Sequence, residues 1–348
     1  MRFFLPKTRF YCGIDLHART MYVCIVDRQG KKLFHKGGRC DAEWFLRVIQ
    51  PYGKSLTVAA ECVSNWYWLA DLCREEKIEF VLGHAQYMKS IHGGKSKSDR
   101  IDSEKIARLL QGGLFPVAYV YPHENRGLRD LLRRRLRFVR LRAQVMTHIQ
   151  NLNQQANLPE LPRDCMKVKS QRDRVLKHFE EEEAKLSVEI DMTLIAQYDQ
   201  VITQLEKYIL ARAKDCHAKS LAVLMSVPGI GKIIALTIAF EVDTIERFQT
   251  RQQFCSYSRL VKCTRESAGK KQGEGGKKIG NPYLKWAFSE AAVHSARLSE
   301  SLAAYLAKLE RKHGKGKGKS FLAHKLGRAV YQMLKEGQVF DEAKFLSC

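Results

Sequence analysis

The first third of the chain consists of short apolar runs separated by turn residues, and this pattern limits the folds open to it. Three runs follow one another closely, the last after an Arg28-Gln29-Gly30 turn, and they predict adjacent strands at 10–15, 21–27 and 31–36. Helix and strand patterns then alternate, at 41–49, 56–61, 66–74, 79–82 and 102–111. Strands that lead into such an alternation indicate a mixed α/β sheet.

Four acidic residues stand at defined places in this predicted domain. Asp15 ends the first run and Glu61 ends the strand at 56–61, so each carboxylate is expected at the carboxyl edge of a strand. Asp99 and Asp102 are three residues apart at the start of a predicted helix and therefore share one helix face. Carboxylates that converge from two strands and a helix can hold hard divalent cations such as Mg²⁺, which keep positions open for phosphate oxygens. A three-stranded start followed by strand, helix and strand is typical of the ribonuclease H-like fold, which we expect for residues 1–124.

Composition narrows the class of partner. The 348 residues are 45% hydrophobic, enough for two or three packed domains. A formal charge of +23 predicts a polyanionic partner, because Lys and Arg displace counterions from phosphate backbones. An acidic membrane surface would also attract such a charge, but no apolar run approaches the roughly 18 residues that span a bilayer. The first ten residues also lack a signal-peptide core, so we expect a cytoplasmic protein.

A strongly basic amphipathic helix is predicted next. Residues 126–142 contain eight arginines and one acid, and the arginines recur at steps of three and four beside an apolar stripe. The pattern predicts phosphate contacts through Arg133, Arg137 and Arg140, although a solvated charged face would look the same.

The basic helix is expected to be half of a hairpin. Pro159 and Pro162 break the helical pattern. A second apolar repeat is spaced as in a coiled-coil seam, at Leu194, Tyr198, Val201, Leu205 and Tyr208. We therefore predict that residues 125–217 form a long antiparallel helical arm that can also join subunits.

The last segment, 218–348, is predicted to be a small, mainly helical and basic domain with 23 Lys and Arg against 11 Asp and Glu. Gly229, Gly231 and Lys232 separate two apolar helical patterns, as in the turn of a helix-hairpin-helix, where glycines let backbone N–H groups approach a phosphate. A plain glycine-rich turn is the alternative. The HGKGKGK stretch at 313–319 is expected to be a flexible tether to nucleic acid or a solvated linker.

A serine in a basic loop is the candidate nucleophile. Ser267 lies close to Arg265, Lys270 and Lys271. A serine hydroxyl is a weak nucleophile until a base or a metal activates it, and Arg or Lys can stabilise the pentavalent phosphate that forms. A serine in such a loop is more often a turn residue or a phosphate contact. Ser256 and Ser258 compete with it, although their segment is predicted to be helical and partly buried, so spacing alone does not select the nucleophile.

Several short signatures occur in order along the chain: Gly13-Ile14-Asp15, Ala60-Glu61, Lys97-Ser98-Asp99-Arg100-Ile101-Asp102, Ser226-Val227-Pro228-Gly229-Ile230-Gly231, Arg247-Phe248, Glu266-Ser267 and Lys278-Ile279-Gly280-Asn281-Pro282-Tyr283-Leu284-Lys285. Together they resemble the DEDD transposases of the bacterial insertion-sequence family one hundred and ten, over nearly the whole chain. One stretch departs from the family: where many relatives carry Gly-Leu-x-Pro before the serine loop, residues 258–263 read Ser-Arg-Leu-Val-Lys-Cys.

The resemblance implies a RuvC-like N-terminal domain, a helical arm and a small C-terminal transposase domain with a catalytic serine. It implies that Asp15, Glu61, Asp99 and Asp102 bind the metal and that Ser267 joins covalently to DNA. The family also uses a structured RNA from its own element to pair with target and donor DNA. Members of the family work as oligomers whose subunits share active sites. The resemblance therefore implies a dimer or tetramer of this chain.

We interpret the sequence as a Mg²⁺-dependent, RNA-guided DNA recombinase that excises and inserts a mobile element through a serine-linked DNA intermediate. A DNA invertase of the same architecture that needs no guide RNA is a second interpretation. A third is a nuclease that resolves Holliday junctions with metal-activated water, in which Ser267 only contacts a phosphate.

Overall fold

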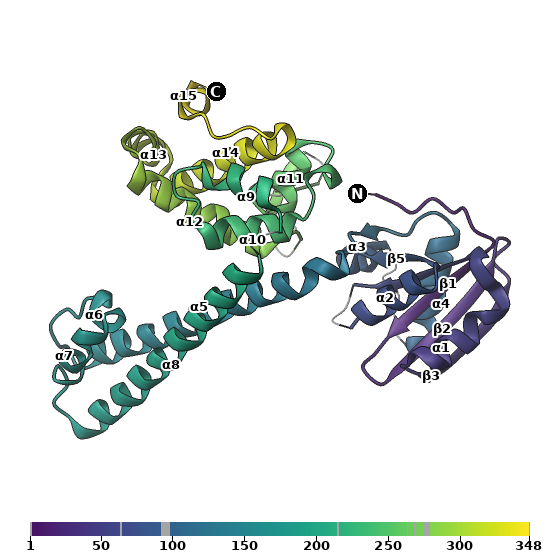
Figure 1. Ribbon diagram of the computed structural model, residues 1–348, viewed down its shortest axis with the longest axis horizontal. Coiled ribbons are helices and arrows are strands. Elements are labelled where there is room, and N and C mark those ends of the chain that lie inside the picture. Colours follow the sequence, from purple (N-terminus) through teal and green to yellow (C-terminus); the bar gives the residue numbers. More distant parts are fainter. Residues whose placement is uncertain are drawn as a thin grey trace. The chain divides into compact units, whose positions relative to one another are not determined.

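The computed structural model describes residues 2–62, 65–91, 98–213, 216–262, 264–267, 269–274 and 279–347. For residues 89–91, 169, 264–267 and 271–274 it describes the backbone alone. The chain divides into two compact units, Met1–Glu124 and Asn125–Cys348, and each is described by itself (Figure 1). Among the described helices, none combines the length and the apolar character needed to cross a membrane.

The first unit is built on a six-stranded sheet in the order β3-β2-β1-β4-β5-β6. The strands are β1 (Phe10–Leu16), β2 (Thr20–Asp27), β3 (Lys32–Arg39), β4 (Leu56–Glu61), β5 (Glu79–Gly83) and β6 (Val117–Ala118). The first three are antiparallel, β4 and β5 run parallel to β1, and β6 is antiparallel to β5. This mixed sheet confirms the predicted ribonuclease H-like fold. The short strand β6 was not predicted.

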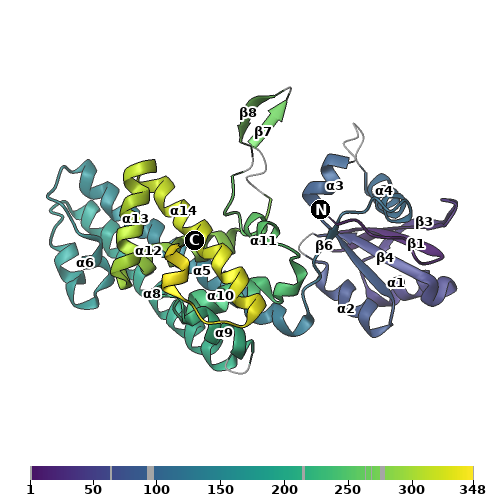
Figure 2. The ribbon, with the colours of Figure 1, turned by 90° about the horizontal axis from the view of Figure 1, so that it is seen from above.

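Helices cover both faces of this sheet (Figure 2). The helices are α1 (Ala42–Ile49), α2 (Tyr67–Glu75), α3 (Ala85–Ile91) and α4 (Asp99–Gln111). Alternate residues of β1 enter separate apolar cores, because successive strand side chains point to opposite faces. Cys12 and Ile14 pack with α1 and α2, whereas Tyr11 packs with α3 and α4. Helix α4 begins one turn earlier than the predicted residue 102, and α3 was not predicted.

Helix α4 lies unusually close to β1. A Cβ atom added to Gly13 would come within 2.3 Å of the backbone nitrogen of Ala107 and the carbonyl oxygen of Ser103. Real Cβ atoms essentially never make such contacts, so only glycine permits this approach. The close packing holds the start of α4, which contains Asp99 and Asp102, near the end of β1, which contains Asp15.

In the second unit, two long helices form the arm (Figure 1). They are α5 (His123–Gln155) and α8 (Glu182–Arg212), and the shorter α6 (Arg163–Lys167) and α7 (Arg172–Leu176) lie between them in sequence. Side-chain bonds join Arg135 to Glu206 and His148 to Asp191, so residues further along α5 meet residues earlier in α8. The two helices are therefore antiparallel, as predicted.

The seam of the arm differs from the predicted one. The buried residues of α8 include a strict seven-residue repeat at Val188, Ile195, Ile202 and Ile209. The predicted repeat is rotated by about one position, and its members Leu194 and Tyr208 are 36% and 54% exposed. Both sets of residues have coiled-coil spacing. The packing of α8 against α5, α6 and α7 buries the set formed by Val188, Ile195, Ile202 and Ile209.

The remaining helices of the second unit form a mainly helical region, as predicted. They are α9 (Ala218–Met225), α10 (Lys232–Val242), α11 (Arg251–Tyr257), α12 (Pro282–Leu298), α13 (Glu300–His313), α14 (Lys315–Glu336) and α15 (Glu342–Ser347). An antiparallel hairpin, β7 (Thr264–Ser267) with β8 (Lys270–Glu274), follows α11. The core includes Phe254, Phe288 and Leu326. The division of this unit into an arm, 125–217, and a separate domain, 218–348, remains a prediction.

The glycine and lysine stretch at 313–319 is not the flexible linker that we expected. His313 ends α13, Gly314 forms a turn with φ +85°, and Lys315–Lys319 begins α14. A buried stripe runs back along α14 from Val330 through Leu326 and Leu322 to Gly318. Burial of this stripe stabilises the helix even though its first turns contain two glycines.

Candidate metal centre and nucleic-acid interface

Strand register brings two of the predicted acids to one edge of the sheet. Ile14 of β1 is paired with Ala60 of β4, so Asp15 and Glu61 are the next residues on two adjacent parallel strands. Asp15 and Glu61 also share the sheet face of Gly13, the face covered by α4. The sequence prediction of paired carboxylates at strand ends thus agrees with the register.

The start of α4 supplies the other two acids. Ser98 caps this helix by accepting a hydrogen bond from the Ile101 backbone N–H at 3.3 Å. Asp99 and Asp102 both lie in the first turn. Asp102 is 3.5 Å from the Lys105 ammonium.

A histidine joins Asp15 and Asp99. The His17 Nε2 atom lies 3.4 Å from a carboxylate oxygen of each residue. One potential ligand atom from each of Asp15, His17 and Asp99 lies within 4.8 Å of the others. His17 was not among the site residues predicted from the sequence. The available signal was its position two residues after Asp15, which places both side chains on one face of an extended strand.

The electrostatics of this group favour a bound cation. Burial raises the pKa of Asp15; His17 opposes this effect, and the negative charges of Asp99 and Asp102 add to it. A cation between these carboxylates would relieve that unfavourable ionisation. The oxygen donors fit Mg²⁺, whereas the imidazole is a ligand more usual for transition metals. The structure thus groups Asp15, His17 and Asp99, with Asp102 near enough to affect Asp15, and places Glu61 beside them through register.

Arg133 does not lie on an open basic face as expected. Its guanidinium donates to the Glu241 carboxylate of α10, with an Nη2 to Oε2 distance of 2.8 Å, and lies over the Tyr283 ring. Arg129 donates to the same carboxylate at 3.0 Å, and Asn281 donates at 2.7 Å. Glu241 is 2% exposed. Arg133 therefore helps to hold α5 against α10 and α12, and its charge is largely neutralised.

Arg137 and Arg140 remain candidate phosphate contacts. Both side chains are exposed on α5, and neither forms an ion pair with the residues that the structure describes. Arg135 and Arg142 of α5, by contrast, form ion pairs with Glu206 and Asp199. The uncompensated part of the basic helix is therefore smaller than its composition suggests.

The glycine turn has two different roles. Gly229 has φ +90°, and a Cβ there would lie 2.3 Å from the backbone nitrogen of Ser295 in α12. Its close approach is thus to protein backbone and not to a phosphate. Gly231 caps the start of α10 and is exposed, as is Lys232. This helix start remains a candidate phosphate contact.

Ser267 lies in a hairpin and not in the expected loop. It ends β7 and pairs with Lys270 across a turn that contains Gly269, whose φ is +75°. Lys270 is exposed. The side chains of Arg265, Ser267 and Lys271 lie outside the described residues, so their roles remain predictions. Of the competing serines, Ser256 is exposed at the end of α11, whereas Ser258 is fully buried.

Comparison with known proteins covers both units. Residues 12–157 match the DEDD transposase domain of the IS110 group, described as "Transposase". Residues 221–307 match the "Transposase IS116/IS110/IS902 family". Both matched segments are therefore similar to IS110-type transposases. The chain is also 23% identical over 294 residues to the "Transposase for insertion sequence element IS1111A" of Coxiella burnetii (strain RSA 493 / Nine Mile phase I), with 82% of the chain and 76% of the relative covered.

These matches indicate that the protein is an enzyme that acts on DNA in transposition. The first match contains all four predicted acids, and the second contains Ser267. Lys97 and Lys278, which belong to the matching signatures, lie outside the described residues. The DEDD family and the acidic group at β1 and α4 together favour dependence on a divalent metal ion.

Proposed function

We propose that this transposase cuts and rejoins DNA with Mg²⁺ held by Asp15, Glu61, Asp99 and Asp102, and that Ser267 forms a covalent link to DNA during the reaction. A structured RNA from the element would choose target and donor. The observation that carries the metal centre is the convergence of Asp15 and Asp99, within 4.8 Å, from the end of β1 and the start of α4.

The metal-binding residues, His17 and Ser267 would have different roles in the reaction. The bound ion would neutralise charge on the scissile phosphate and activate a coordinated hydroxyl. The His17 Nε2 lies 3.4 Å from both Asp15 and Asp99; when it carries a proton it would donate to these carboxylates and help to keep them in place. When the Ser267 Oγ attacks phosphorus, an O–P ester bond forms as the ester bond to the leaving oxygen breaks. The serine proton passes to a base, and the leaving oxygen takes up a proton.

The covalent step can be tested directly. Wild-type protein with donor DNA, guide RNA and Mg²⁺ is expected to give a protein–DNA adduct that survives denaturation, because the phosphoserine diester is a covalent bond. Ser267→Ala removes the attacking oxygen and should give none. Denaturing gel electrophoresis of labelled DNA measures both results.

Ser256→Ala and Ser258→Ala are the matched controls, and both should retain the adduct. An adduct in Ser267→Ala that is lost in Ser256→Ala would place the nucleophile on α11. Strand cleavage with no adduct in any protein would instead support the junction-resolving nuclease that uses metal-activated water.

Dependence on a guide RNA distinguishes the proposed recombinase from an invertase that works without one. Sequencing of nucleic acid that copurifies with the transposase should recover one structured RNA, and ribonuclease treatment should stop recombination. Recombination that survives complete removal of RNA would favour an invertase without a guide.

Arg137 and Arg140, two exposed arginines of α5, give a separate prediction. Arg137→Gln with Arg140→Gln should reduce the log–log salt slope of duplex binding by about 1.8, because each lost phosphate contact removes about 0.9. The control is Lys185→Gln with Lys207→Gln, two exposed cations of α8 that have the same total charge. Equal slopes in the two variants would contradict a phosphate-contacting role. Fluorescence anisotropy over a salt series provides the measurement.

The proposed homo-oligomer is supported by an apolar stripe on α8. Leu186, Ile190 and Leu194 recur at four-residue steps and are exposed in the single chain. Exposed apolar stripes of this kind often mark contacts between proteins. The stripe lies outside the buried seam of the arm and is therefore available to another copy.

A further inference from the structure

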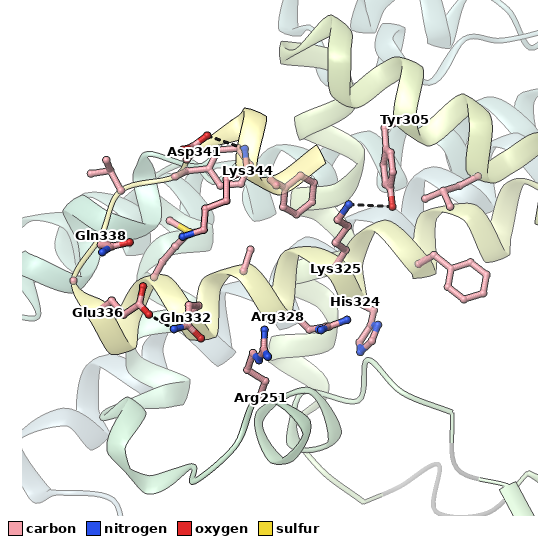
Figure 3. A pocket seen from close by; sticks show the side chains of 18 of the residues that line it. Arg251, Tyr305, His324, Lys325, Arg328, Gln332, Glu336, Gln338, Asp341 and Lys344 are labelled. Atoms are coloured by element: carbon pink, nitrogen blue, oxygen red, sulfur yellow. Dashed lines mark hydrogen bonds between the residues drawn. The ribbon is translucent and has the colours of Figure 1, made fainter. Parts of the chain in front are cut away.

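A cavity of about 970 Å³ lies along α14 in the C-terminal part of the second unit (Figure 3). Phe321, Lys325, Arg328 and Gln332 line it at steps of three and four, so they form one helix face. Helix α13, the segment before α15, α15 itself and Arg251 of α11 supply the rest of the lining. We call this cavity the α14 groove.

Most of the α14 groove is formed by residues outside the two segments that match transposases. Apart from Arg251 and Tyr305, its lining residues follow residue 307, where the second family match ends. The four acids belong to the first unit, whereas the described residues that line the groove belong to the second.

Positive charge in the α14 groove is not balanced by ion pairs. Arg251, Lys325, Arg328 and Lys344 line it, and no ion pair with a described residue neutralises any of them. Two acids also line the groove, and both form local bonds: Glu336 accepts from the Gln332 amide, and Asp341 accepts from the Lys344 backbone N–H at 2.9 Å. Four cations against two acids favour an anionic ligand.

Aromatic rings accompany these cations. The Lys325 ammonium lies 3.3 Å from the Tyr305 hydroxyl and over the Tyr305 and Phe345 rings, at 4.3 Å and 4.8 Å from their centroids. Phe321 is 46% exposed and contacts the His313 ring at a centroid distance of 4.7 Å. An exposed ring next to unpaired cations suits a ligand that has both flat bases and phosphates.

We propose that the α14 groove binds a short single-stranded segment of nucleic acid, with phosphates on Arg328 and Lys344 and a base stacked on Phe321. Single strands fit because their base faces are free to stack, whereas a duplex hides them. DNA and RNA share this chemistry, so separate probes must identify the source.

Photocrosslinking to the full chain tests the proposal without divalent ions, which prevents cleavage. The probes are 12-nucleotide oligothymidylate with 4-thiothymidine, oligouridylate with 4-thiouridine, and a duplex of the same length. We expect mass spectrometry to map crosslinks from a single-stranded probe to the α14 segment around Phe321. The single-stranded probe with the higher crosslink yield at α14 identifies whether the groove binds DNA or RNA. The duplex probe should crosslink there weakly.

Two variants with a matched control make the test specific. Arg328→Gln with Lys344→Gln should lower the α14 crosslink yield about ten-fold and reduce the salt slope by about 0.7 for each lost contact. Phe321→Ala should lower the yield about five-fold or more with little change in slope, since stacking is lost and charge is kept. The control is Lys308→Gln with Lys319→Gln, exposed cations of α13 and α14 outside the groove, and it should match wild type.

Other results would overturn the proposal. These are the absence of α14 crosslinks with both single-stranded probes, equal yields in the groove and control variants, or equal crosslinking by duplex. Loss of self-association in the groove variant, with unchanged crosslinking, would show a contact between copies instead. Ser267→Ala and Asp15→Asn should crosslink at α14 like wild type. Nucleic-acid binding in the α14 groove is therefore tested independently of the proposed reaction.

Discussion

Replacing Asp15 with Asn is expected to lower the rate of DNA strand cleavage by about 10³-fold or more, which corresponds to about 4 kcal/mol of transition-state stabilisation. The substitution keeps the shape of the side chain and removes one negative charge from the group formed with His17 and Asp99. Single-turnover cleavage of labelled donor DNA at saturating Mg²⁺ measures the effect. Retention of the wild-type rate would refute the assignment of Asp15 to the metal centre.

Two controls separate lost chemistry from lost folding. Glu43→Gln removes an equally sized charge from a highly exposed side chain on α1, on the opposite face of the sheet, and should leave cleavage unchanged. Mg²⁺ should raise the unfolding temperature of wild type more than that of Asp15→Asn, because a ligand stabilises the state that binds it. Without metal, Asp15→Asn should fold at least as stably as wild type at pH 7, since burial and neighbouring acids raise the pKa of Asp15 and disfavour its ionised form.

Replacing Glu241 with Ala is expected to lower the unfolding free energy of the second unit by about 3–5 kcal/mol. The change leaves Arg129, whose side chain is 8% exposed, without its buried partner and also removes the acceptor of Arg133. Breaking a buried ion pair from one side has this magnitude because the remaining charge stays desolvated. Urea denaturation followed by circular dichroism measures the loss.

Glu206→Ala provides the control, because its ion pair with Arg135 joins α8 to α5 at a partly exposed position. Its loss should cost about 1 kcal/mol or less. Equal losses in the two variants would mean that the Glu241 network contributes no more than a surface pair.

The same network predicts a dependence on pH. Burial alone would raise the pKa of Glu241, but the hydrogen bond from Arg133 and the charges of Arg129 and Arg133 outweigh it and hold the pKa below the ordinary value. The stabilisation is therefore complete above the unfolded pKa of about 4.3 and declines as pH falls through the lower folded value. Glu241→Gln should lack this component of acid destabilisation.

Much of the first unit follows from local sequence pattern. The strand at 56–61 has the predicted bounds, and β1 and β2 differ from prediction by one residue at one end. Their apolar alternation and turn residues act over a few positions, so they can be read locally. The strand β6 has two residues and forms only by pairing with β5, so no local pattern marks it.

The residues of the candidate site also fall into two groups: those that a local pattern marks and those that depend on distant partners. Asp15, Glu61, Asp99 and Asp102 are marked by their places at strand and helix ends, and the order of short signatures indicates the IS110 family. His17 was missed because its partner Asp99 is 82 residues away, and Arg133 was assigned to an open face because its partner Glu241 is 108 residues away.

By itself, the sequence determined the mixed sheet, the helical arm, the positions of the four acids and the basic character of the chain, because each depends on neighbouring residues or on composition. Tertiary structure alone decided which α8 stripe packs in the arm, which arginines of α5 keep a free charge, and that residues 315–319 are helical. It also assembled the α14 groove from three helices, the segment before α15 and Arg251. These features depend on burial and on charges far apart in the chain, and both arise only when the helices pack together.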